Sequence, residues 1–228
     1  MTAPAGTSPA RLRLSLAQLR YVADLAGAVL PAELTALADA AARYDGGTDC
    51  GLEDLVARGV VTRDAAGTVA AAEQVSDDLR LLGSSDVALD VRGRVGHRTT
   101  VGSYAIDGAA CVAVLVADDG AVELSRLPAA RLAEELPRLV PALPAARDAL
   151  SHGTLRAQVR RGAHDGRRLG QVMWVADGAG WRAMVPVQTV DGRPDVQLTP
   201  REPADLSADL APLLGPGDTR APQLGRDR

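Results

Sequence analysis

This sequence is poor in large and reactive side chains. It has no phenylalanine and no lysine, and only two tryptophans, three tyrosines, three histidines and two cysteines among 228 residues. Valine, leucine and alanine must therefore fill the core, and a hydrophobic content of 46% is enough for a sizeable one. Cys50 and Cys111 form neither a CxxC pair nor a disulfide framework. We expect them to be small buried residues in a reducing cytosol.

Charge and hydropathy argue against two kinds of partner. The net charge is −4, without the basic excess that supplies most of the affinity of nucleic-acid-binding proteins. No stretch approaches the roughly 18 apolar residues that a membrane span needs, and the N-terminal residues lack an apolar run of signal-peptide length. We therefore expect a soluble cytoplasmic protein that binds neither nucleic acid nor membrane.

Motifs for catalysis are also absent. The sequence contains no GxGxxG, P-loop, GxSxG or HExxH pattern. His97, His152 and His164 have no second histidine or cysteine at metal-ligand spacing. Carboxylate pairs such as Asp77-Asp78 suit solvation and turn formation. The sequence thus predicts no enzyme, no cofactor and no metal site.

An internal repeat is the main positive signal. The stretch from Val101 and the stretch from Leu169 each give a strand, an Asp-Gly-Ala turn and a second strand. A second Asp-Gly turn follows in each, then a short alternating strand, AVELS or DVQLT, and then an amphipathic helix. The inward positions of the two helices are Leu132, Leu136, Leu139 and Val140 in the first, and Leu206, Leu210, Leu213 and Leu214 in the second.

The residues before the repeat predict helices after one short strand. We expect a strand at 11–15, a helix capped by Ser15 and running to Ala26, and helices at 31–43, 52–58 and 69–82. Two sets of four antiparallel strands then follow, each closed by a helix. The fold class is α+β, a pseudo-two-fold pair of antiparallel sheet units with an N-terminal helical segment.

The predicted domain organisation is one domain between two disordered tails. The segments are a tail at 1–10, a domain at 11–214 that divides into 11–83, 84–145 and 146–214, and a tail at 215–228. A duplicated sheet-and-helix unit of this kind more often binds other proteins than performs chemistry.

Two groups of residues are candidates for protein binding. The first is the arginine-rich pair of hairpin loops after the first strand of each unit, with Arg92, Arg94, His97 and Arg98 in one and Arg160, Arg161, Arg167 and Arg168 in the other, beside His164. Arginine is enriched at protein interfaces and pairs with carboxylates, so these loops could meet an acidic partner. Ordinary solvated loops would have the same composition.

The second group contains three of the few aromatic residues, Tyr104, Trp174 and Trp181, with Met173 and Met184 nearby. Aromatic side chains and methionine are favoured at the centres of interfaces. They are equally favoured in ordinary cores, and the absence of phenylalanine requires that some be core. Both interpretations stay open at this stage.

The order of these elements resembles the EspG family, the cytoplasmic chaperones of type VII (ESX) secretion in actinobacteria. The resemblance runs from Leu12 to Leu214. It is carried by the opening LRLSLAQLRYVADLAG, the element LVARGVV, the helix-to-sheet stretch AAEQVSDDLRLLGSSDVALDVRG, and the final strands and helix from Gln171. This chain is somewhat shorter than many members of the family.

The resemblance implies a non-enzymatic chaperone without a cofactor. Members of that family bind the helical tip of the PPE subunit in a PE-PPE heterodimer, through the sheet face and the C-terminal helical part, and keep this substrate soluble. We expect this chain to be a monomer or a weak homodimer that does the same. The alternative is a regulatory α+β domain that holds a small molecule between its two halves without catalysis.

Overall fold

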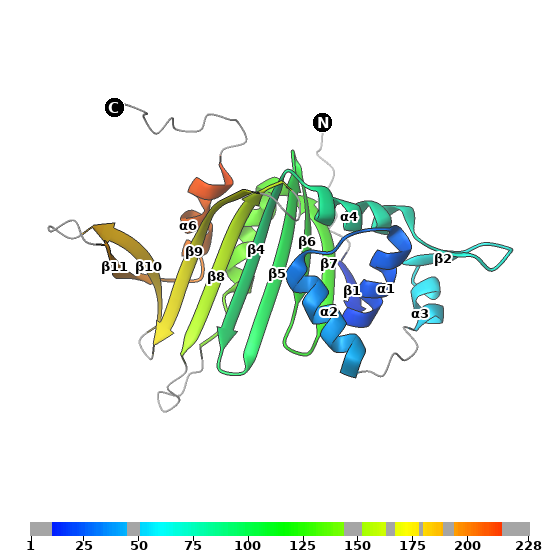
Figure 1. Ribbon diagram of the computed structural model, residues 1–228, viewed down its shortest axis with the longest axis horizontal. Coiled ribbons are helices and arrows are strands. Elements are labelled where there is room, and N and C mark those ends of the chain that lie inside the picture. Colours follow the sequence, from blue (N-terminus) through cyan, green and yellow to red (C-terminus); the bar gives the residue numbers. More distant parts are fainter. Residues whose placement is uncertain are drawn as a thin grey trace, which may run out of the picture.

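The computed structural model describes residues 11–44, 51–143, 152–162, 167–177, 180–188 and 194–215. The predicted tails lie outside these ranges except for Gly215, as do Cys50, His164 and the predicted turn at Asp191-Gly192. Figure 1 shows one broad sheet with helices packed on both of its faces.

Nine antiparallel strands form this sheet in the order β1-β7-β6-β5-β4-β8-β9-β10-β11 (Figure 1). The strands are β1 Arg11–Ser15, β4 Val87–Val95, β5 Arg98–Asp107, β6 Ala110–Val116, β7 Ala121–Pro128, β8 Gly153–Arg161, β9 Arg167–Asp177, β10 Gly180–Gln188 and β11 Pro194–Arg201. Asp107 and Gly108 make the turn between β5 and β6, and Gly108 has the positive φ of 55° that glycine adopts without strain.

The sheet has the predicted pseudo-two-fold arrangement. β4 and β8 are central neighbours and pair antiparallel from Val87↔Arg161 to Val95↔Gly153. On one side of this pair the order continues β5, β6, β7, and on the other side β9, β10, β11. An axis perpendicular to the sheet between β4 and β8 therefore relates the two sets of four strands. This arrangement confirms the predicted α+β fold class, with β1 added at the outer edge of the first set only.

Four helices precede the first set of strands. They are α1 Leu16–Ala26, α2 Ala32–Tyr44, α3 Leu52–Ala57 and α4 Glu73–Ser84. Ser15 caps α1 as predicted, because its Oγ accepts a hydrogen bond from the Gln18 N–H at 3.1 Å. The Gln18 side chain accepts in return from the Ser15 N–H at 3.0 Å, which completes a capping box.

The predicted helix at 69–82 is wrong at its start. Val69–Ala71 form β3, which pairs with β2 (Val61–Arg63) in a separate two-stranded sheet, and α4 begins only at Glu73. A side-chain turn between the two strands explains the difference. Asp64 Oδ1 accepts hydrogen bonds from the N–H groups of Ala66 and Thr68 at 2.9 and 2.8 Å, so the chain reverses there.

The helical segments after each set of strands differ in regularity. After β7 come a 3-10 helix η1 (Ala129–Arg131), a single turn α5 (Leu132–Glu135) and a second 3-10 helix η2 (Leu136–Leu139), rather than the one helix predicted. Pro137 has no N–H to donate and interrupts the α-helical pattern. α6 (Asp205–Leu214) is continuous. No helix in the described ranges is both long and apolar enough to cross a bilayer.

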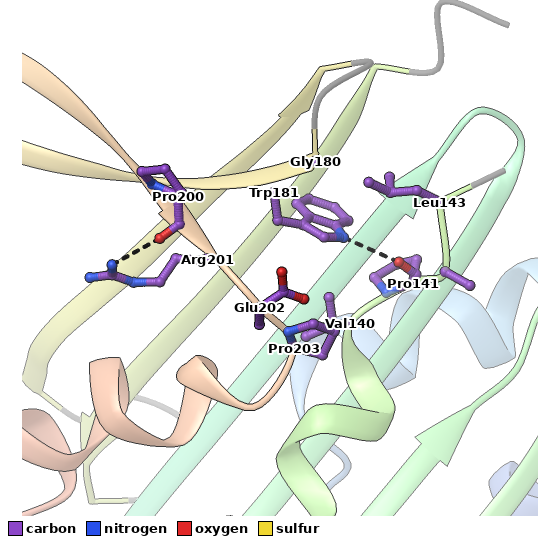
Figure 2. A pocket seen from close by; sticks show the side chains of 10 residues that line it. Val140, Pro141, Leu143, Gly180, Trp181, Pro200, Arg201, Glu202 and Pro203 are labelled. Atoms are coloured by element: carbon purple, nitrogen blue, oxygen red, sulfur yellow. Dashed lines mark hydrogen bonds between the residues drawn. The ribbon is translucent and has the colours of Figure 1, made fainter. Parts of the chain in front are cut away.

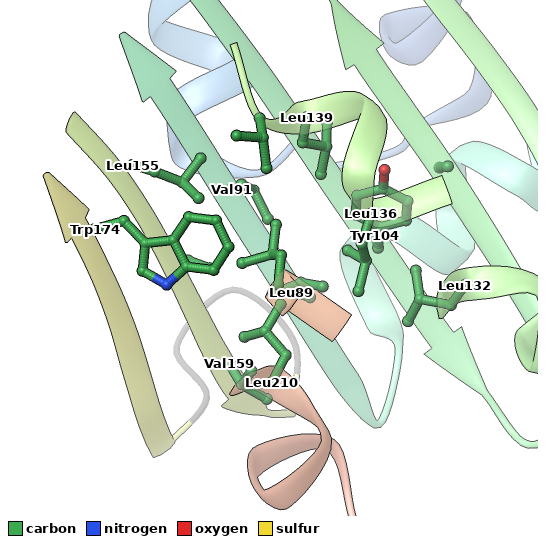
Figure 3. Packing of buried hydrophobic residues seen from close by; sticks show 14 of the residues in the cluster. Leu89, Val91, Tyr104, Leu132, Leu136, Leu139, Leu155, Val159, Trp174 and Leu210 are labelled. Carbon is green, nitrogen blue, oxygen red and sulfur yellow. The ribbon is translucent and has the colours of Figure 1, made fainter. Parts of the chain in front are cut away.

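Each face of the sheet carries a separate hydrophobic core. η2 and α6 cover the central strands on one face, where Leu136, Leu139 and Leu210 pack against β4, β5, β8 and β9 (Figure 3). On the opposite face α1, α2 and α4 pack against β5, β6 and β7. The second core therefore spans only the first half of the sheet.

Candidate partner-binding surface

The pseudo-two-fold axis matches individual positions in the two halves. The turn at Asp107, which pairs with Ala110, corresponds to the turn at Asp177, which pairs with Gly180. The registers of the outer strands then match Leu124 with Leu198. By the same registers Val122 of β7 matches Val196 of β11, so the two halves have the same residue types at these positions.

Helices bury these positions in the first half. α4 contacts β5 and β6, and α1 contacts β7 on the same face. Val122 and Leu124 are only 1% and 2% exposed beneath them. Leu19 and Val22 of α1 and Leu79 of α4 are fully buried in the same cluster. The strand residues on this face of the first half are therefore ordinary core residues.

The equivalent face of the second half has no helical cover within the described ranges. α6 packs on the other side of β8 and β9, behind them in Figure 1, while α1 and α4 lie over the first half. Of the N-terminal helices, only the start of α2 comes near the second half, where Ala32 and Glu33 line a hollow with Arg156 of β8. As a result Val196 is 47% exposed and Leu198 44% exposed, and Met173 of β9 is 37% exposed. Met184 of β10 lies directly opposite Leu198 in the register and is half-buried.

We call this surface the open face. It consists of Arg92 and Arg94 of β4, Arg156 and Gln158 of β8, Met173 and Val175 of β9, Met184 of β10, and Val196 and Leu198 of β11. β9 and β10 pair only from Gly180↔Asp177 to Ala183↔Trp174, so Met173 and Met184 lie just beyond the last pair. Several exposed apolar side chains on one face of a folded domain are typical of an interaction site. Apolar side chains predominate on the β9–β11 part of the open face, where Arg182 of β10 and Gln171 of β9 also lie, and arginines predominate on β4 and β8.

The arginines of the open face lie in an unfavourable arrangement. Arg92 and Arg156 are directly opposite each other in the β4–β8 register, and both are exposed. Like charges at such positions destabilise a sheet. In the described parts of the chain, neither guanidinium forms an ion pair with a carboxylate. Within the described residues, this pair therefore has no direct ion-pair partner to offset its repulsion, although Glu33 and Asp90 lie nearby.

Two further predicted arginines are engaged within the sheet. Arg160 forms an ion pair with Asp90, whose Oδ1 also accepts a hydrogen bond from the Ser103 hydroxyl at 2.9 Å. Arg168 donates to Gln158 Oε1 at 3.3 Å. Their charges are therefore partly used in holding neighbouring strands together.

The two predicted arginine loops lie at opposite ends of the sheet. Because β4 and β8 are antiparallel, the turn after Val95 is at the end where β8 begins, and the loop after Arg161 is at the other end. His97 and Arg98 are exposed at the first end, and Arg167 is exposed at the second. The loops are related by the pseudo-two-fold axis, but they do not form one basic patch. The strands, rather than the loops, bring Arg92, Arg94 and Arg156 together.

The aromatic candidates lie in the core under η2 and α6 (Figure 3). Tyr104, Trp174 and Trp181 are 1%, 0% and 5% exposed. The Trp174 indole N–H donates to Asp209 Oδ2 of α6 at 2.9 Å, and Arg201 Nε donates to the same oxygen at 2.9 Å. These contacts attach α6 to β9 and β11. As partner contacts the three residues stay a prediction, and in this conformation they present almost no surface to a partner.

The outer edge of β11 is closed to the addition of another strand. Pro194 and Pro200 have no N–H, and the N–H of Val196 donates to Oδ1 of the preceding residue, Asp195, at 2.8 Å. Alternate residues of a strand point their N–H groups to the same side, so Pro194, Val196, Leu198 and Pro200 share the side away from β10. Among the described residues of β11, only Leu198 therefore has an N–H that is available at this outer edge. Prolines at an edge are a known protection against strand pairing. A partner of the second half must therefore use the face and not the edge.

A hollow between the two halves would be the site for the alternative function. It measures about 360 Å³ and lies between the segment after η2 and the start of β10 (Figure 2). Two of its polar side chains have internal partners: Trp181 Nε1 donates to the Pro141 carbonyl at 3.3 Å, and Arg201 donates to Asp209 and to the Pro200 carbonyl. The Glu202 carboxylate also lines the hollow and makes no hydrogen bond with the described residues. A small ligand would have to compete with these contacts, so the hollow offers few groups to fix its orientation.

The described residues contain no cluster of three or more metal-ligating side chains. Cys111 is fully buried, and burial raises the pKa of its thiol to about 12. It is therefore a packing residue, as the sequence predicted.

Several residues of the open face escape prediction from the sequence. In the sequence, Met173 and Met184 are distinguished only as neighbours of the tryptophans, Val196 and Leu198 only belong to an expected strand, and Arg156 has no distinguishing signal. The repeat itself contains the missing signal. The first half has helices before it over residues 16–84, whereas the second half is preceded by only a short join after Leu143.

Comparison with solved structures supports the fold. The EspG5 chaperone of the type VII secretion system of Mycobacterium tuberculosis, solved in complex with a PE25-PPE41 dimer, matches with a TM-score of 0.52. The match covers 87% of this chain and 94% of the EspG5 chain at 12% sequence identity. No protein-family model matches the sequence, and no curated protein matches it. The likeness therefore concerns the EspG fold alone.

Proposed function

We propose that this protein is a chaperone or adaptor of the EspG type that binds the helical tip of a PE-PPE heterodimer in the cytoplasm. Binding covers an apolar end of the substrate and keeps it soluble for type VII secretion. The protein needs no cofactor for this role and performs no catalysis.

One observation carries the proposal: an EspG-like sheet presents an uncovered apolar surface bordered by arginines. Met173, Val196 and Leu198 are each more than a third exposed. Burial of such side chains contributes about 25 cal/mol per Å² of apolar area, which is the main attraction in most protein associations. The solved EspG5 complex contains a PE-PPE dimer, which is the partner we assign to this chain.

Co-expression with PE-PPE pairs encoded in the same genome tests the function. We expect one pair to co-purify with this protein as a stable complex and to remain soluble at concentrations where the pair alone precipitates. Charge reversal at Arg92 and Arg94 should weaken binding in a calorimetric titration, and reversal at Arg98 tests whether the loop end contributes. Co-purification of none of these pairs would refute the proposal. A thermal shift with a small metabolite instead would favour the ligand-binding alternative.

A further inference from the structure

We propose that the open face binds two partner helices in the positions that α1 and α4 occupy on the first half, with partner carboxylates placed over Arg92 and Arg156. The partner thus supplies the helical layer that this face of β9–β11 lacks among the residues the structure describes. Only the identity of the partner rests on the proposed function; the position and chemistry of the docking helices come from the chain itself.

The first half is a template for this contact. α4 lies over β5 and β6, which correspond to β9 and β10, and α1 lies by β7, which corresponds to β11. α1 contacts the sheet layer with Leu19, Val22 and Ala26, a spacing of three and four residues. A docking helix should therefore present apolar residues at i, i+3 and i+7. One helix would cover Met173 and Met184, and the second would cover Val196 and Leu198.

The charges indicate that the partner helices are acidic on one flank. The first half already pairs a helix carboxylate with a strand arginine. Oδ1 of Asp78 in α4 lies 2.7 Å from Nε of Arg126 in β7. At the junction of the two halves, a hollow of about 110 Å³ lies between the start of α2 and the arginines of β4 and β8. Arg92, Arg156 and Arg160 line it with Glu33 and Asp90. Guanidinium groups bind carboxylates with two parallel hydrogen bonds, so this border favours glutamate or aspartate.

The protected edge of β11 excludes the other common mode of binding to a sheet. An extended partner strand would need a row of free N–H groups along β11, and Pro194, Pro200 and the Asp195 side chain remove most of them. A helix needs only side-chain contacts with the face. The occupant we infer is therefore helical and not a strand.

Methionine-methyl NMR reports directly on this face. The chain has three methionines, and two of them, Met173 and Met184, lie on the open face. With ¹³C-methyl methionine and assignments from Met→Leu variants, we expect both signals to shift when the co-purifying PE-PPE pair binds. A pair that binds without shifting either signal would overturn the inference and leave the proposed function intact.

Substitutions on the open face should weaken the same complex. Leu198→Glu and the double change Arg92→Glu with Arg156→Glu should each raise Kd about tenfold or more, as expected for residues central to an interface. Val29→Glu and Arg131→Glu are the matched controls, because Val29 is 61% exposed but outside the open face and Arg131 lies on the exposed η1. Leu198→Ala serves as a milder second variant. Equal loss in the controls, or none in the open-face variants, would refute the assignment.

A designed probe separates this inference from the proposed function. The probe is a synthetic antiparallel helical hairpin with leucines at i, i+3 and i+7 and glutamates along one flank, and its control carries lysines in place of the glutamates. If no PE-PPE pair binds, the proposed function fails, and the hairpin decides the inference alone. We expect the glutamate hairpin to shift both methionine signals and the lysine hairpin to bind at least about tenfold more weakly. Absence of shifts with the glutamate hairpin would overturn the inference.

Discussion

Leu124 and Leu198 are the same residue type at equivalent positions, so their replacement by alanine isolates the effect of the helical layer. Leu124 is 2% exposed beneath α1 and α4, whereas Leu198 is 44% exposed on the open face. Replacing a buried leucine by alanine costs about 2–5 kcal/mol, because apolar contacts are lost and a cavity remains. At Leu198 nearly half of the side chain is already in water, so we expect a loss of about 1 kcal/mol or less.

Urea unfolding of the two variants and the wild type measures these free-energy losses, and thermal unfolding measures the matching change in Tm. For a chain of this size, each kcal/mol corresponds to about 2–4 °C in Tm, so Leu124→Ala should lower Tm by roughly 4–20 °C and Leu198→Ala by about 4 °C or less. The pair Val122→Ala and Val196→Ala repeats the comparison with a smaller side chain. Equal destabilisation by Leu124→Ala and Leu198→Ala would show that the open face is covered in the free protein. It would refute the inference that Leu198 lies on an uncovered surface.

Two further predictions concern buried titratable groups. Burial raises the pKa of Asp78 above its usual value, against the opposing effect of Arg126. The folded state therefore holds this proton more tightly than the unfolded state, and the stability that Asp78 contributes is lost as pH rises through the raised pKa. As pH rises above the ordinary aspartate pKa of 3.8, the unfolding free energy of the wild type should fall relative to that of Asp78→Asn. A difference between the two proteins that does not change with pH would contradict this. In a Cys50→Ser background, Cys111 should resist a disulfide reagent at about pH 8 until denaturant is added, and rapid native labelling would show that it is accessible.

The succession of main-sheet strands along the chain could be predicted because most of these strands contain a local signal. Alternation of apolar and polar residues marked β4 and β8, and Asp-Gly pairs such as Asp107-Gly108 marked the hairpins. Ser15 identified the start of α1 through its capping box. The β2–β3 hairpin was missed because three-residue strands are too short for alternation to be read, and the helix after β7 was predicted as continuous although Pro137 divides it.

The open face could not be predicted in the same way, since burial there depends on helices from another part of the chain. Val122 and Val196 have the same pattern in their strands, and only the position of α1 and α4 makes one a core residue and the other a surface residue. The arginines were identified by composition alone. Their cross-strand pairing, with Arg92 opposite Arg156, depends on the register between β4 and β8. Because 57 residues lie between these two strands in the sequence, no local pattern reveals that register.

The placement of the N-terminal helices on one half of the sheet also determines the valence of the protein. A duplicated sheet has two equivalent faces of similar shape. A protein with both faces uncovered could bind two partners and cross-link them into larger assemblies. Here α1 and α4 cover this face of the first half, so each chain has a single open face for a partner. Under the proposed function, we therefore expect complexes with one PE-PPE pair per chain rather than two.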